Sequence, residues 1–161
     1  MAVQTTYLDN LPAGLAGMIA NTEPNVLISR EVETSAGIGF GLPVRRGTNP
    51  ATQCRVMAAG ATEVLGITVR DHSTTDDKFA QYDSALLMRQ GVIWVLVTDA
   101  GGVAAGDPVW VTLSTGAFSN ADVGSGNGLL LPGCRWESAG ANGALAKMRV
   151  NLDLLAIAGA A

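Results

Sequence analysis

The side chains best suited to chemistry in this chain gather around its only histidine. His72 is flanked by Asp71, Ser73, Asp76 and Asp77, which could supply the base and nucleophile of a hydrolase or oxygen ligands for a hard cation. A Ser–His–Asp triad, however, is assembled from distant parts of a fold, and a calcium-binding loop needs a spacing and a glycine that are missing here. The sequence therefore favours a solvated polar loop over a hydrolase or a metal site.

A glycine-rich stretch over residues 99–108 could cradle a phosphate or could turn the chain between two strands. A phosphate site needs a helix after the loop, because the N-terminal amides of that helix face the anion. Here the sequence VWVTL follows at 109–113, and β-branched and aromatic residues favour a strand. Gly-Lys-Ser/Thr and a complete G-x-G-x-x-G are also missing. We therefore predict a strand, a turn and a strand, and no bound cofactor.

The two cysteines, Cys54 and Cys134, lack the spacing of metal ligands. Cys54 could act as a nucleophile only beside a positioned base, and His72 is the sole histidine. One disulfide between the cysteines stays open, but we favour two free, buried thiols in a reducing cell.

Three tryptophans, Trp94, Trp110 and Trp136, fall in three different predicted strands. On one sheet face they would form a platform for a carbohydrate. We instead expect Trp94 and Trp136 to pack in the core, because large aromatic side chains dominate core energetics. Trp110 lies opposite the aliphatic side of its strand, so it is the better candidate for a contact between subunits, where tryptophan is enriched in hot spots.

The composition indicates a single domain whose outer surface is partly covered by other subunits. Of the 161 residues, 48% are hydrophobic and 15% are charged, whereas average proteins have about 25% charged residues. So much apolar surface is unusual for a solitary monomer. Eight of the ten cationic residues are arginine, the cation that is enriched at protein interfaces.

The charge and the apolar runs argue against several classes of partner. A net charge of −4 and a pI near 4.8 disfavour nucleic-acid binding through a basic surface. No apolar run approaches the roughly 18 residues of a membrane span. Because no Lys or Arg precedes the apolar stretch 11–20, we also expect no secretion signal.

The pattern of turns and apolar runs divides the chain into three segments. Residues 1–25 contain proline and glycine without a clean period and are expected to form an N-terminal arm, 26–153 a β-domain, and 154–161 an apolar C-terminal tail. The strands are predicted near 26–30, 39–46, 55–57, 63–70, 85–97, 109–113, 133–138 and 144–153. Many short strands without an amphipathic helix predict an all-β fold, as a β-sandwich, jelly roll or barrel.

Alternation predicts which strand residues face the core. The expected inward positions are Leu65, Ile67 and Val69 in one strand and Ala146, Met148, Val150 and Leu152 in another. Gly66, Thr68 and Arg70 are expected to face outward, and Asn142-Gly143 to turn the chain. Residues 92–97 are apolar on both faces, which predicts a strand at the centre of the fold or against another chain.

Six short motifs follow one another between residues 30 and 152. They are GIGFGLPVRRG (37–47), EVLGITVR (63–70), GVIWV (91–95), AGDPVWV (105–111), LPGCRWE (131–137) and KMRVNL (147–152). In this order they resemble the structural cement, or decoration, proteins of tailed bacteriophages. The strongest single piece is the Ala-Gly-Asp-Pro-Val turn, with the Leu-Gly-Ile strand upstream.

This resemblance implies a jelly-roll-like β-domain with an extended N-terminal arm, made in the host cytoplasm and placed on the outer surface of an icosahedral phage head. It implies no catalysis and no cofactor. The implied partners are the major capsid protein and further copies of the chain, as dimers in the members that it most resembles, with trimers left open. By bridging neighbouring major capsid subunits, the protein would stabilise the shell against the pressure of packaged DNA.

We expect the contacts with the capsid and between subunits to come from the arm, from three arginines and from one tryptophan. These residues are Tyr7, Leu8, Leu11, Leu15, Arg30, Arg45, Arg46 and Trp110. Two other functions stay open. A carbohydrate- or receptor-binding β-sandwich of a virion would use the tryptophans, and a hydrolase would need His72.

Overall fold

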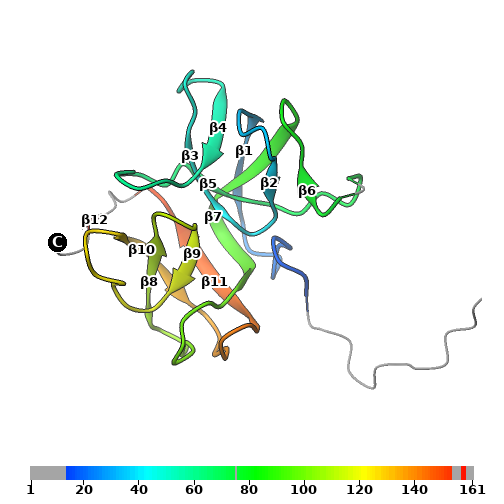
Figure 1. Ribbon diagram of the computed structural model, residues 1–161. Coiled ribbons are helices and arrows are strands. Elements are labelled where there is room, and N and C mark those ends of the chain that lie inside the picture. Colours follow the sequence, from blue (N-terminus) through cyan, green and yellow to red (C-terminus); the bar gives the residue numbers. More distant parts are fainter. Residues whose placement is uncertain (1–13, 75, 154–156, 159–161) are drawn as a thin grey trace, which may run out of the picture.

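The structure, a computed structural model, describes residues 14–74, 76–153 and 157–158 (Figure 1). These residues form strands and no helix, so the predicted all-β class is confirmed. The strands are β1 (Val26–Val32), β2 (Ile38–Gly39), β3 (Pro43–Arg46), β4 (Gln53–Val56), β5 (Gly66–Thr68), β6 (Lys78–Phe79), β7 (Ser84–Leu96), β8 (Pro108–Thr112), β9 (Ala117–Ser119), β10 (Gly128–Trp136), β11 (Leu145–Asn151) and β12 (Ile157–Ala158).

The first five strands of the main sheet close into a circuit, here called the first barrel. β1 pairs with β4 in parallel, and antiparallel pairs then connect β4 to β3, β3 to β5, β5 to β7 and β7 back to β1. The short pair β2–β6 is a separate two-stranded sheet. A core of nine buried side chains, with Phe79 and Leu87 among them, belongs to this half of the molecule.

The second half of β7 begins another circuit, here called the second barrel. β7 pairs with β11, followed by β10, β8 and β9. A bridge between Val97 and Phe118 returns the circuit from β9 to the end of β7. Figure 1 shows the two barrels in the upper and lower parts of the view, joined by β7 in green. The strand order of these two circuits does not confirm that the fold is a jelly roll.

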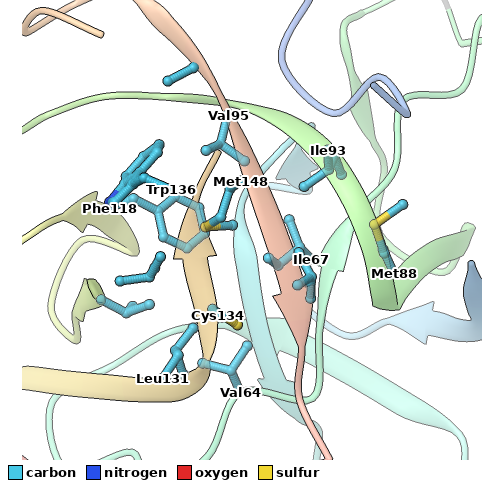
Figure 2. Close-up of a cluster of buried hydrophobic side chains, with 14 of the residues drawn as sticks. Val64, Ile67, Met88, Ile93, Val95, Phe118, Leu131, Cys134, Trp136 and Met148 are labelled. Atoms are coloured by element: carbon cyan, nitrogen blue, oxygen red, sulfur yellow. The ribbon is translucent and has the colours of Figure 1, made fainter. Parts of the chain in front are cut away.

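β7 supplies both cores from its two faces. Leu87 belongs to the core of the first barrel, whereas its neighbour Met88 packs with Ile93 and Val95 in the larger core of the second (Figure 2). β7 is therefore central, as expected, although the second face of the run 92–97 is only partly covered, with Leu96 45% exposed. Where β7 passes between the barrels, Gly91 has a φ of 137°, and a Cβ there would lie 2.9 Å from Asn25 Cβ. A side chain at this position would push the two segments apart.

The expectation for residues 63–70 was wrong in part. All three residues of β5 are buried, because both faces of the strand are covered: Ile67 packs in the second core, and Thr68 faces the segment 39–42. The Thr68 hydroxyl replaces water by donating to Gly39 O (2.7 Å) and accepting from Leu42 N (2.9 Å). Leu65 packs in the first core and Ile67 in the second, so the two do not share one face of the core.

Several local predictions are confirmed. On β11, Ala146, Met148 and Val150 are buried, and Gly143 turns the chain before it with a φ of 81°. The strand expected over 39–46 is instead split into β2 and β3, because Gly41 turns the chain with a φ of 70°.

Candidate functional site

The glycine-rich stretch 99–108 is a turn whose amides are already engaged. Asp99 Oδ1 accepts from Gly101 N (2.8 Å) and Asp107 Oδ2 from Ala104 N (2.9 Å). Gly106 N donates to Trp136 O (2.7 Å). The predicted strand–turn–strand unit is confirmed, and two carboxylates occupy the place that an anion would need.

In the described residues of the polar loop around His72, two carboxylates are engaged by neighbouring groups. His72 is exposed, Asp77 pairs with Arg70 (2.6 Å), and Asp71 Oδ1 accepts from Ser73 N (2.8 Å). The backbone hydrogen bond from Ser73 lowers the pKa of Asp71. Within 14–74, 76–153 and 157–158, no group of three His, Cys, Asp or Glu residues could hold a metal ion. The loop has the solvated character that its composition predicts.

Both cysteines are free and buried, as predicted. Cys54 packs in the first core and Cys134 in the second. Burial raises the pKa of each thiol to about 11. The thiols are therefore protonated at neutral pH, which argues against a nucleophilic role.

The three tryptophans differ in burial. Trp136 is 1% exposed in the second core, as predicted. Trp94 was expected in the core but is half-buried on the outer face of β7, where Lys147 lies 5.2 Å from its ring centre. Trp110 is half-buried on β8, opposite Leu130. Because Trp136 is inaccessible, the three rings cannot form an exposed carbohydrate platform.

The segment 14–20, here called the arm root, is hydrogen-bonded to both barrels. Gly17 N donates to Trp94 O (2.8 Å) in the second barrel, and Gly17 O accepts from Arg70 N (2.7 Å) at the end of β5 in the first. Two more bonds extend this pairing along β7: Trp94 N to Met18 O (2.9 Å) and Ala20 N to Val92 O (2.8 Å). The arm root thus behaves as an additional short strand that holds the two barrels together.

Gly17 and Arg70 fix the position of the arm root. Gly17 has a φ of +84°, and a Cβ there would lie 2.8 Å from Phe40 Cβ and 2.9 Å from Arg70 N. Arg70 was expected to face outward, but its side chain is only 12% exposed. Its Nε donates to Ala16 O (3.0 Å), and its guanidinium lies 4.7 Å from the Phe40 ring centre. Alternation could not show this, because the arm root covers what would otherwise be the solvent side.

A second attachment lies at the end of the described arm. Arg149 on β11 donates to both oxygens of Glu23 (2.8 and 3.1 Å) and to Glu137 Oε1 (2.5 Å). The hydrogen bond from Arg149 lowers the pKa of Glu23, and the two carboxylates raise the pKa of Arg149. Residues 14–25 are therefore held against the β-strands at both ends of this segment.

Of the arm residues predicted to make contacts, some lie outside the described residues and one lies within them. Tyr7, Leu8 and Leu11 lie outside the described residues, whereas Leu15 is 44% exposed. An apolar hollow of about 270 Å³ lies beside the arm root, lined by Ala16, Phe40, Leu42, Leu96, Phe118 and neighbouring residues.

The predicted arginines lie in the first barrel. Arg45 on β3 donates from Nε to Val56 O (3.0 Å). Arg46 pairs with Glu63 (3.0 Å) and donates to Pro50 O (3.0 Å). Both line a hollow of about 340 Å³ with Arg55, a residue that the sequence analysis did not select. Arg30 on β1 donates to Ser29 O (2.7 Å) and does not line this hollow.

Arg55 was missed because its importance depends on strand register. Arg45 and Arg55 stand directly opposite each other in the β3–β4 pair. The only sequence signal was the spacing of two arginines on either side of a turn-rich segment, which does not by itself specify a register.

Comparison with known proteins identifies the family. The family model of the structural cement protein (E217 gp24/Pam3 gp6) matches residues 3–151. No curated protein matches the chain. A chain from the capsid of Myoviridae phage XM1 shares the fold, with a TM-score of 0.74 and 21% identity over 96% of this chain and 100% of that one. In the described part of the chain, no helix is long and apolar enough to cross a membrane. The match over nearly its whole length shows that the chain belongs to the phage structural cement protein family.

Proposed function

We propose that this cement protein strengthens the phage capsid by bridging neighbouring subunits of the major capsid protein on the outer surface of the shell, without catalysis. The family places the protein in the virion, on the capsid. The observation that carries the bridging proposal is the arm root, which is hydrogen-bonded to both barrels. A force on the arm would therefore reach the whole β-domain rather than a single loop.

Two surfaces are proposed to contact the shell. The first is the arm, with Tyr7, Leu8, Leu11 and Leu15 as its apolar contacts. The second is the group of arginines in the first barrel, Arg45 and Arg46, with Arg30 at its side. Because the arm root is hydrogen-bonded to both barrels and the arginines lie in the first one, binding at both surfaces would connect two capsid subunits through the β-domain.

The stabilisation would come from apolar surface buried at each joint of the shell. Burying about 300 Å² of apolar area would contribute roughly 7 kcal/mol before the cost of association. Each attached subunit would also raise the effective concentration of its second contact. Trp110, half-buried on the second barrel, is the proposed anchor between copies of the chain in a homodimer.

Co-sedimentation with undecorated, expanded shells of the same phage tests this function. Saturable binding at a constant ratio to major capsid subunits is the expected result, and the ratio would identify the occupied symmetry positions. A variant lacking residues 1–13 is expected to bind more weakly, while its β-domain remains folded by circular dichroism. If the intact chain does not sediment with mature shells, the bridging function is wrong.

A further inference from the structure

Arg45 and Arg55 form a pair of like charges that makes no ion pair within 4.0 Å in the described structure. They stand directly opposite each other on β3 and β4, an arrangement that destabilises a sheet. The pKa of Arg45 is lowered by burial and by the charge of Arg55. The first barrel therefore holds two cations close together in a chain that is acidic overall.

Of the other six arginines in the described chain, four have a carboxylate partner within 4.0 Å, whereas this pair, like Arg30 and Arg135, has none. Arg46, Arg70, Arg89 and Arg149 each form an ion pair. The charge of Glu33 reaches both Arg45 and Arg55. The oxygens of Glu33, however, already accept hydrogen bonds from Thr48 N (2.8 Å) and Thr48 Oγ1 (2.5 Å).

The hydrogen-bonding groups of the pair are also incompletely used. Among the described residues, Arg45 donates only to Val56 O (3.0 Å). The Nε of Arg55 is buried and has no hydrogen-bond partner. A guanidinium has five N–H donors, and a buried donor without an acceptor destabilises the structure that contains it. Both side chains line the hollow of about 340 Å³, which is large enough to admit a carboxylate side chain.

We infer that Arg45 and Arg55 form a socket for a carboxylate side chain of the neighbouring capsid subunit. This inference rests on the proposed bridging function. A planar guanidinium binds a carboxylate through two parallel hydrogen bonds, so two guanidiniums can hold one or two acidic side chains. On the wall of the same hollow, Arg46 already pairs with one carboxylate, Glu63, through a single contact of 3.0 Å.

A carboxylate fits this socket better than a phosphate does. Glu63 lines the hollow and Glu33 lies close enough to act on both arginines. The charges of these two carboxylates repel a doubly charged phosphate more strongly than a singly charged acidic side chain. Glu33 and Glu63 thus favour a partner whose acidic groups each carry a single negative charge.

The test uses a substitution that changes stability and binding in opposite directions. Arg55→Glu places a carboxylate opposite Arg45, which replaces repulsion by an internal ion pair and fills the socket. We expect its thermal midpoint to equal or exceed that of the wild type. We expect its affinity for undecorated, expanded shells to fall at least about tenfold. Arg55→Gln removes the charge alone and is expected to weaken binding less.

Lys78→Glu is the matched control, because it makes the same change of charge at an exposed residue of β6 that does not line the hollow. The inference is supported if Arg55→Glu loses shell binding while it stays folded and Lys78→Glu binds as the wild type does. It is overturned if Arg55→Glu binds normally, or if its thermal midpoint falls in parallel with its binding. Failure of the wild type to bind shells would overturn the bridging function itself.

A competition experiment separates carboxylate from phosphate recognition. At constant ionic strength, wild-type binding is measured in acetate and in inorganic phosphate. Similar binding in the two buffers agrees with a carboxylate socket. Displacement by millimolar phosphate but not by acetate would overturn the assignment in favour of a phosphate site.

Discussion

Gly17→Ala is the substitution that most directly tests how the arm is joined to the β-domain. The φ of +84° at Gly17 is a left-handed conformation, which costs a residue with a Cβ about 1–2 kcal/mol. The new Cβ would also meet Phe40 Cβ at 2.8 Å and the backbone nitrogens of Arg70 and Gly41 at 2.9 Å. Overpacking of this kind adds about 1–3 kcal/mol, so a rigid response would cost roughly 2–5 kcal/mol in total.

The chain has an alternative response, which is to release the arm root. Release breaks the four backbone hydrogen bonds that join Gly17, Met18 and Ala20 to Arg70 and to β7. At about 1 kcal/mol net for each bond, this costs about 4 kcal/mol. Because the protein adopts the less costly response, we expect the free energy of unfolding to fall by about 2–4 kcal/mol.

Gly60→Ala separates the backbone strain from the steric clash. Gly60 has a similar φ of +78°, but a Cβ there meets nothing within 4 Å. Chemical denaturation should therefore show a loss of about 1–2 kcal/mol for this control, from the left-handed conformation alone. The difference between the two variants measures the contacts of the arm root.

Hydrogen exchange identifies which response occurs. The amides of Trp94 and Arg70 donate to the arm root, so both should lose protection in Gly17→Ala and keep it in Gly60→Ala. Shell binding should weaken only in the first variant, because a released arm no longer transmits force to both barrels. Equal destabilisation by the two variants, with both amides still protected, would refute the role assigned to Gly17.

Three further predictions concern charge, thiol reactivity and a buried hydroxyl. Because the folded-state pKa of Glu23 is lowered by Arg149, its contribution to stability is complete above the ordinary value of 4.5 and is lost as the pH falls through the lowered one. The protection factors of the arm-root amides, which correct for the pH dependence of intrinsic exchange, should therefore fall in acid, and Arg149→Ala should abolish this dependence. With pKa values raised to about 11, Cys54 and Cys134 should resist a thiol reagent at pH 8 in the native protein and react once it is unfolded; rapid native labelling would contradict their burial. Thr68→Val, which leaves two buried backbone groups without the hydroxyl, should cost about 1–3 kcal/mol in chemical denaturation, and a neutral effect would show that the hydroxyl is not needed there.

Much of the local structure could be predicted from the sequence because it depends on neighbouring residues. The alternation on β11 placed Ala146, Met148 and Val150 in the core, and the run 92–97 indicated a central strand. The same reasoning failed for β5, where Thr68 is buried despite its polarity. Alternation distinguishes two faces only when one of them meets water, and β5 is covered on one face by the second core and on the other by the segment 39–42.

By itself, then, the sequence determined the all-β class, the turns at 99–108 and 142–143 and the resemblance to cement proteins. Only the tertiary structure decided that β7 belongs to two barrels, that residues 14–20 join both of them, and that Arg55 stands opposite Arg45. The physical reason is that strand order and register are set by pairs far apart along the chain, such as β1 with β7. Periodicity describes the face of a strand, but it contains no information about which strand lies beside it.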